Sequence, residues 1–166
     1  MPTILLKNGQ VGCGLGVYDA DVLIEDGHVV GGRGKIVDTY DWGKDIKADK
    51  IIDCSGKLIL PGLIDVHVHF REPGAAYKED WETGSKAAVA SGVTTVLDMP
   101  NNTPAVVGCE DLEAKRGLVE GRSYCNYGFY IGYNGKNIEE INKAENVPAV
   151  KFYACDSTGN MGVKNT

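Results

Sequence analysis

The chain has 166 residues, a formal net charge of −6 and a hydrophobic content of 43%. This balance is typical of a globular chain and argues against a nucleic-acid surface, since no cluster of lysine and arginine offsets the acidic charge. No apolar run approaches the ~20 residues of a bilayer span, and the N-terminus lacks the pattern of a signal peptide. The five cysteines include no Cys-x-x-Cys pair, which favours reduced thiols and a cytoplasmic protein.

The first 60 residues contain short alternating segments separated by glycine and aspartate, which predict a small antiparallel β unit. The glycine-rich run at 12–16 lacks the spacing of a dinucleotide-binding loop and is expected to form a turn. His28 follows an Asp-Gly pair and is expected to be a solvated hairpin residue rather than a metal ligand. The predicted strands cover residues 4–7, 21–25, 28–30, 35–38, 51–53 and 57–60.

From residue 61 onward, strands alternate with helices. The predicted strands are 64–70, 94–99, 124–131 and 149–154, and the predicted helices are 79–91, 110–120 and 137–144. Gly92 and Gly121 are expected to end the first two helices. Such alternation predicts parallel strands in an α/β fold. Four strands with polar residues at their C-terminal ends indicate the first half of a (β/α)₈ barrel, because a complete barrel has eight strands and about 250 residues.

Two histidines lie in the first of these strands. Residues 63–70 are expected to form a buried strand in which Asp65, His67, His69 and Arg71 point to the same side, since alternate residues share a face. Two imidazoles near a strand end are able to bind one metal ion, and a planar guanidinium suits a carboxylate. Histidines satisfied within a core are the alternative, although unpaired buried polar groups are costly.

The run PGLIDVHVHFREPG at 61–74 resembles the metal-binding signature of cyclic amidohydrolases, and that of dihydroorotases in particular. Related hydantoinases, dihydropyrimidinases and allantoinases keep a similar His-x-His but usually lack an arginine at position 71. The resemblance implies that Arg71 binds a substrate carboxylate. The run DMPN at 98–101 also resembles a dihydroorotase motif, which implies that Asn101 shares this role. Ordinary turn chemistry is the alternative for Asn101.

Lys151 lies in the apolar strand predicted at 149–154. Burial shifts a lysine toward its neutral amine, and a neutral amine is able to add carbon dioxide and become a carbamate. The resemblance implies that a carbamylated Lys151 bridges two zinc ions, with His67 and His69 as further ligands. The alternative is a lysine that extends from a strand end into water. The loop at 157–161 also resembles the family, and Cys155 is expected to be a small buried residue or a neighbour of the site.

The resemblance implies a zinc-dependent, reversible hydrolysis of dihydroorotate to N-carbamoyl-aspartate, a step of pyrimidine biosynthesis. Residues 1–60 would then be the N-terminal part of a small β-sandwich, and residues 61–166 the first four β/α units of an amidohydrolase-type TIM barrel. The family's further histidine ligands and its catalytic aspartate come from later strands. No residue here matches them, and neither Asp65 nor Asp98 replaces them by motif, so the catalytic residue stays unassigned.

Association with other chains is expected, and two alternatives to this function remain open. The chain is expected to associate with itself or with a complementing C-terminal half, because a half-barrel exposes strand edges and an apolar interior. The first alternative to a dihydroorotase is a non-catalytic scaffold that resembles one. The second is another cyclic amidohydrolase of the allantoinase or hydantoinase type.

Overall fold

A computed structural model of the chain describes residues 2–14, 16–25, 35–40, 47–155 and 161–163. The chain divides into two compact units, Met1–Gly62 and Leu63–Thr166. The strand predicted at 28–30, His28 and most of the loop at 157–161 lie outside the described residues. None of the three helices in the described part of the chain has the length and hydropathy needed to cross a membrane.

The first unit is a five-stranded sheet built around its first strand. Strands β1 and β2 pair antiparallel, as do β2 and β3, while β4 and β5 both run parallel to β1. The predicted antiparallel unit is therefore wrong for β4 and β5, because parallel pairing needs a long crossover that local sequence patterns do not reveal. The strands are β1 (Thr3–Cys13), β2 (Gly16–Glu25), β3 (Lys35–Tyr40), β4 (Lys50–Asp53) and β5 (Leu58–Ile59).

The predicted glycine-rich turn joins β1 to β2. Cys13 pairs with Gly16, so the chain reverses direction between them. Gly16 has φ of +139°, a backbone conformation that side-chain-bearing residues rarely adopt. The prediction of a turn rather than a nucleotide-binding loop is confirmed.

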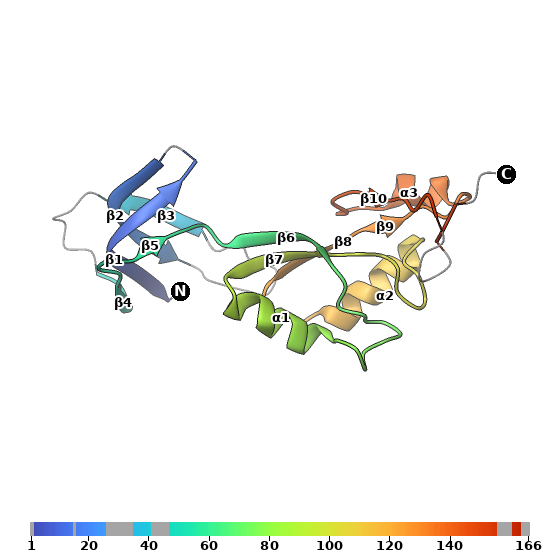
Figure 1. Ribbon diagram of the computed structural model, residues 1–166, viewed down its shortest axis with the longest axis horizontal. Helices are drawn as coiled ribbons and strands as arrows, with labels where there is room; N and C mark the ends of the chain where they lie inside the picture. Colours follow the sequence, from blue (N-terminus) through green and yellow to red (C-terminus); the bar gives the residue numbers. More distant parts are fainter. Residues whose placement is uncertain (1, 15, 26–34, 41–46, 156–160, 164–166) are drawn as a thin grey trace. The chain divides into compact units, whose positions relative to one another are not determined.

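The second unit contains a sheet of three parallel strands, in sequence order, with the unit's first two helices on one face (Figure 1). The strands are β6 (Leu63–Val68), β7 (Val93–Asp98) and β8 (Asn126–Phe129). Helices α1 (Trp81–Ala90) and α2 (Cys109–Val119) connect them. The predicted alternation of strand and helix is therefore present.

The strand predicted at 124–131 is interrupted at Tyr130. Its last part, β9 (Ile131–Gly132), pairs in parallel with β10 (Val150–Lys151), and α3 (Ile138–Lys143) lies between them in the chain. The Tyr130 N–H donates to the carbonyl of Asp98, while the Gly132 N–H donates to the carbonyl of Val106. The first bond continues the β7 ladder and the second leaves it, so one predicted strand becomes two.

Local signals set the ends of the helices. The Asp80 side chain accepts a hydrogen bond from the Thr83 N–H at 2.7 Å and caps the start of α1. Gly92 and Gly121 follow the ends of α1 and α2 with φ of +84° and +72°. Glycine adopts this conformation without steric penalty, and both predicted helix stops are confirmed.

The core of this unit lies between the sheet and the two helices. Trp81 is completely buried and meets Phe70, Tyr127 and Phe129 edge-on, with ring centroids 4.9 to 5.5 Å apart. Aromatic rings favour such edge-to-face contacts. Phe70 lies in the chain between His69 and Arg71, so the core anchors the segment that carries these residues. The core residues are Phe70, Trp81, Val96, Val106, Leu112, Val119, Cys125 and Phe129.

β6 is exposed at every residue except Val68, which corrects the prediction of a buried strand at 63–70. Leu63, Ile64 and Val66 are 59%, 63% and 55% exposed. β6 is the edge of its sheet and pairs with β7 alone among the described strands. An apolar edge strand of this kind needs another surface to cover it. Within the predicted stretch, Phe70 belongs to the core and Val68 packs against it.

Candidate metal and anion site

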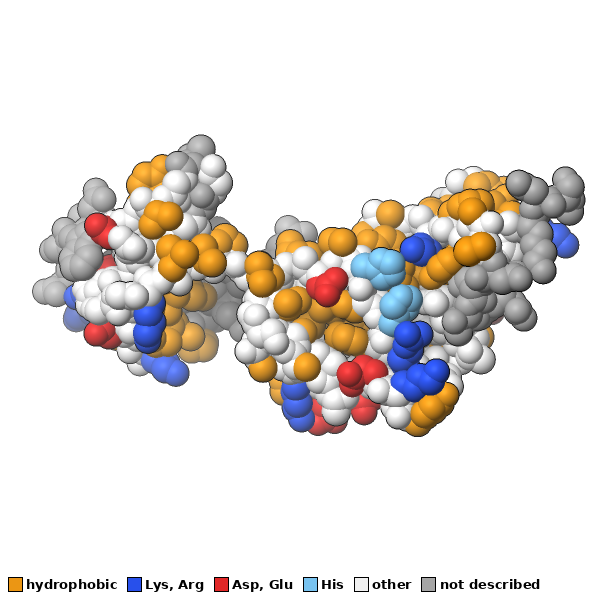
Figure 2. Space-filling model, viewed as in Figure 1, with side chains coloured by type: hydrophobic (Ala, Val, Ile, Leu, Met, Phe, Trp, Pro, Cys, Tyr) orange, Lys and Arg blue, Asp and Glu red, His pale blue; other side chains and the backbone are white. Residues whose placement is uncertain are grey.

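His67 and His69 lie together at the C-terminal end of β6. Their ring centroids are 5.2 Å apart and the rings are tilted by 54°. Figure 2 shows both histidines on one face of their unit, with acidic and basic side chains around them. The sequence prediction that these two side chains come together is met in the structure.

The alternation that places them is not regular. Asp65 pairs with Val96 and Val68 pairs with Asp98, so three steps along β6 oppose two steps along β7. This is a β-bulge, which re-aims side chains at a strand end. The Asp65 carboxylate accepts the His67 N–H at 3.0 Å and supports the bulge. Asp65 thus has a backbone role next to the histidines.

The spacing of the two rings fits a shared metal ion. With Zn–N distances of about 2.0–2.1 Å, two imidazoles on a tetrahedral zinc have centroids roughly 5 Å apart. Among the described residues, no group of three or more histidine, cysteine, aspartate or glutamate side chains is arranged to hold a metal. A metal ion there would take two ligands from the histidine pair, and other donors would have to complete the site.

The surroundings of His69 favour its neutral form. Burial lowers the pKa of its imidazole, and the positive charge of Arg71 lowers it further. The Asp98 charge and a hydrogen bond with Asn101 oppose this shift. Because a metal binds neutral imidazole, a lowered pKa keeps His69 available as a ligand at lower pH.

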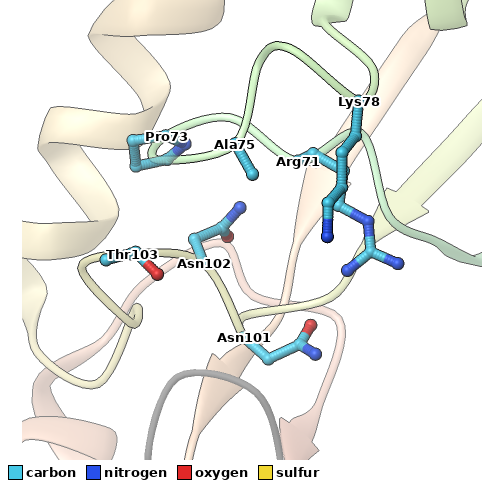
Figure 3. Close-up of a pocket in the computed structure, with 7 residues that line it drawn as sticks. All are labelled: Arg71, Pro73, Ala75, Lys78, Asn101, Asn102 and Thr103. Atoms are coloured by element: carbon cyan, nitrogen blue, oxygen red, sulfur yellow. The ribbon is translucent and has the colours of Figure 1, made fainter.

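Arg71 and Asn101 line one open hollow. Figure 3 shows the Arg71 and Lys78 side chains extending from the loop after β6, with Asn101 on the loop after β7. The structure thus brings the two predicted substrate-binding residues together. The lining residues are Arg71, Pro73, Ala75, Lys78, Asn101, Asn102 and Thr103.

Lys78 was not predicted from the sequence. It contributes a second positive charge to this hollow, and neither Arg71 nor Lys78 forms a salt bridge within the described part of the chain. Two unpaired cations beside amide groups favour an anion. The available signal was its place in the loop after β6, since loops at the C-terminal ends of parallel strands carry site residues.

A buried ion pair lies behind the hollow. The Lys115 ammonium is 2.5 Å from Asp98 Oδ2, and both side chains are completely buried. It also donates to Asn102 Oδ1 at 2.7 Å and to the Met99 carbonyl at 3.2 Å. Burial lowers the pKa of the Lys115 amine, while the Asp98 charge opposes the shift. The sequence did not reveal this lysine, because lysines on helices are usually solvent-exposed.

Lys151 lies on β10, whose hydrogen-bonded partner is β9 rather than a strand of the β6–β8 sheet. Its side chain is half-buried, and its Nζ is 4.9 Å from the centre of the Tyr153 ring. Its carbonyl accepts the Tyr133 N–H at 2.9 Å. Cys155 is exposed, so the expectation of a buried cysteine is wrong.

The sequence resembles a known family and individual relatives. The model of the amidohydrolase family matches residues 58–153. A dihydroorotase from Methanosarcina mazei is 37% identical over 170 residues, covering 99% of this chain and 35% of the relative. A dihydroorotase from Lactobacillus helveticus is 52% identical over 100 residues, covering 60% of this chain and 21% of the relative. The chain thus spans about a third, or less, of these relatives' lengths.

Solved structures show the same likeness. An L-hydantoinase (dihydropyrimidinase) from Arthrobacter aurescens matches with a TM-score of 0.86 and 25% identity, covering 100% of this chain and 36% of that one. A D-hydantoinase (dihydropyrimidinase) from Thermus sp. matches with a TM-score of 0.75 and 28% identity, covering 98% and 35%. Family match, sequence relatives and fold agree, and the chain belongs to the amidohydrolase family.

Proposed function

We propose that this chain carries the first metal ligands and the carboxylate-binding residues of a dihydroorotase. The reaction would be the zinc-dependent, reversible hydrolysis of the cyclic amide of dihydroorotate to N-carbamoyl-aspartate, in pyrimidine biosynthesis. The observation that carries this proposal is the position of Arg71, two residues after His69 and in one hollow with Asn101. The related sequences named dihydroorotases support the same substrate.

Each residue has a distinct role in this proposal. His67 and His69 would hold a zinc ion, and a carbamylated Lys151 would be a further ligand. When bound, zinc supplies a Lewis acid and a hydroxide near neutral pH. Arg71 and Asn101 bind the substrate carboxylate, which turns the cyclic amide toward the histidines. Lys78 adds positive charge to the same hollow and strengthens the attraction for a dianion.

The architecture is proposed on the same grounds. Residues 1–60 would form the N-terminal part of a β-sandwich, and residues 61–166 the first four β/α units of a TIM barrel. Because the apolar edge strand β6 is exposed, we infer that a complementing C-terminal half or a second copy covers it. Cys54, Cys109, Cys125 and Cys155 are all free thiols, which supports a reducing compartment such as the cytoplasm.

A hydantoinase-type activity is the second candidate, favoured by the fold match to hydantoinases. The two substrates differ in charge, since dihydroorotate carries a carboxylate and hydantoin does not. A guanidinium in the hollow has a partner in the first case and none in the second. Binding of the two compounds therefore separates the candidates.

The test is an NMR titration of the ¹⁵N-labelled chain with N-carbamoyl-L-aspartate or hydantoin, with zinc present. We expect N-carbamoyl-L-aspartate to shift the resonances of Arg71 and Asn101, and Arg71→Ala to abolish these shifts. Lys86→Ala is the matched control, because Lys86 pairs with Glu82 on the exposed face of α1. Equal binding of hydantoin, or binding that survives Arg71→Ala, would contradict the proposal.

A further inference from the structure

Two hydrogen bonds hold the backbone on either side of Arg71. The Phe70 N–H donates to Asp98 Oδ1 at 2.9 Å, and the Glu72 carbonyl accepts from Asn102 Nδ2 at 2.9 Å. Between them, Arg71 has φ of +61°, a left-handed conformation that residues with a side chain rarely adopt. The surrounding structure must therefore impose this conformation.

One ammonium group orients both of these clamps. Lys115 donates to the second oxygen of the Asp98 carboxylate and to the side-chain oxygen of Asn102. Its third bond goes to the Met99 carbonyl, so its three donor positions are all used. The bond to Asn102 Oδ1 fixes which end of that amide faces Glu72. The bond to Asp98 Oδ2 leaves Oδ1 for the Phe70 N–H.

We propose that Lys115 is a positioning residue that holds His69, Arg71 and Asn101 in a single arrangement from behind the site. Lys115 bonds Met99 and Asn102 on both sides of the Pro100–Asn101 segment. Through Asp98 and Asn102 it acts on Phe70 and Glu72, the two neighbours of Arg71. It touches neither the hollow nor the histidines directly, since it does not line the hollow and its side chain is completely buried. That these three residues bind zinc and a substrate carboxylate rests on the proposed function. That Lys115 holds them in place does not depend on it.

A purely structural role explains the lysine less well. Buried ion pairs contribute little net stability, because desolvation offsets their attraction, and apolar replacements often do as well. The space around Lys115 is already apolar in part, with its Nζ 4.9 Å from the centre of the Phe129 ring. A methionine would therefore pack there, yet it would leave Asp98 and Asn102 without their common partner.

The test compares three variants of the whole chain. Lys115→Met removes the ammonium but leaves the buried Asp98 charge unpaired. Lys115→Met combined with Asp98→Asn removes both charges and leaves no unpaired buried charge. It therefore tests the role of Lys115 even if the single variant does not fold. Leu112→Ala is the matched control, because Leu112 is a buried residue of α2 that packs in the core. It lowers stability without touching the Lys115 bonds.

Two readouts follow from the proposal. Removing supporting residues of this kind typically costs about tenfold to a hundredfold in affinity, so we expect that loss for N-carbamoyl-L-aspartate in both Lys115 variants. We also expect amide hydrogen exchange at Phe70 to accelerate relative to amides in the middle of β7. Leu112→Ala should lower the unfolding temperature while keeping wild-type affinity at temperatures where it is folded.

The outcomes separate the two proposals. A folded double variant with unchanged affinity and unchanged relative exchange at Phe70 would overturn the role of Lys115. An equal loss of affinity in folded Leu112→Ala would also overturn it, since the effect would then follow stability alone. If the wild-type chain binds no N-carbamoyl-L-aspartate, the proposed function fails. Amide exchange at Phe70 in the Lys115 variants then tests the positioning role by itself. Faster exchange supports that role, and unchanged exchange refutes it.

Discussion

Two glycines within helices offer a direct test of the packing behind the site. A Cβ at Gly84 of α1 would lie 2.8 Å from two ring carbons of Phe70, whereas a Cβ at Gly117 of α2 would meet nothing within 4 Å. Gly84→Ala and Gly117→Ala therefore add the same methyl group to a crowded and to an open position. The variants differ in packing and share the gain in helix propensity.

The expected magnitudes follow from these two terms. Alanine in place of glycine within a helix is worth about 0.5–1 kcal/mol. Extra atoms in a packed core cost about 1–3 kcal/mol. Phe70 has little room to move, because its ring packs edge-on against the buried Trp81 with centroids 4.9 Å apart. We expect Gly117→Ala to stabilise the chain and Gly84→Ala to be about 1–3 kcal/mol less stable than it.

The assay is urea unfolding followed by circular dichroism. The two variants are comparable if the unfolding free energy depends on urea concentration with the same slope in both. The propensity gain cancels in the difference, so the difference measures the clash with Phe70. Because Phe70 lies between His69 and Arg71, zinc affinity should also fall in Gly84→Ala and stay unchanged in Gly117→Ala. If Gly84→Ala were as stable as Gly117→Ala, Phe70 would not pack closely against α1 at Gly84.

Three further predictions concern single side chains. In the folded chain His69 should gain its proton below pH 6.5, since burial lowers its pKa. The unfolded chain binds this proton at a higher pH than the folded chain does. The free energy of unfolding therefore falls as the pH drops from 6.5 toward the pKa of the folded chain. An NMR midpoint at or above 6.5 would contradict this. Arg71→Lys keeps the charge but loses the planar fork, so its affinity for N-carbamoyl-L-aspartate should fall in the same titration; wild-type affinity would show that charge alone suffices. Arg122→Ala should destabilise the chain by about 1–3 kcal/mol in urea unfolding, because Arg122 bonds the half-buried Glu72 carboxylate; a loss below about 0.5 kcal/mol would place that pair among ordinary surface contacts.

The local features of the second unit were predictable from the sequence. Alternating apolar residues marked β6 and β7, and Gly92 and Gly121 marked the ends of α1 and α2, because these signals act within a few residues. The pairing of His67 with His69 followed from strand geometry, although the bulge beside Asp65 did not. A bulge depends on the register with the neighbouring strand, which the local sequence does not contain.

The features that were missed depend on contacts distant in the chain. After Tyr130 the chain bonds Val106 in place of β7, and the parallel position of β4 arises from its pairing with β1. Lys78 and Lys115 look like ordinary surface lysines until the fold places one in the hollow and buries the other. The exposure of β6 was missed because an apolar pattern indicates only that a strand tends to pack against another surface. It does not show that the described residues supply that surface.

The most direct test of the central claim is turnover in a chimera. The Methanosarcina mazei dihydroorotase aligns with 99% of this chain over 35% of its own length, so this chain would replace the corresponding segment. We predict that the chimera converts dihydroorotate to N-carbamoyl-aspartate with zinc present. Separate His67→Ala and Arg71→Ala variants should abolish turnover, while Lys86→Ala should retain it. A folded chimera without turnover, or turnover that survives both His67→Ala and Arg71→Ala, would contradict the account.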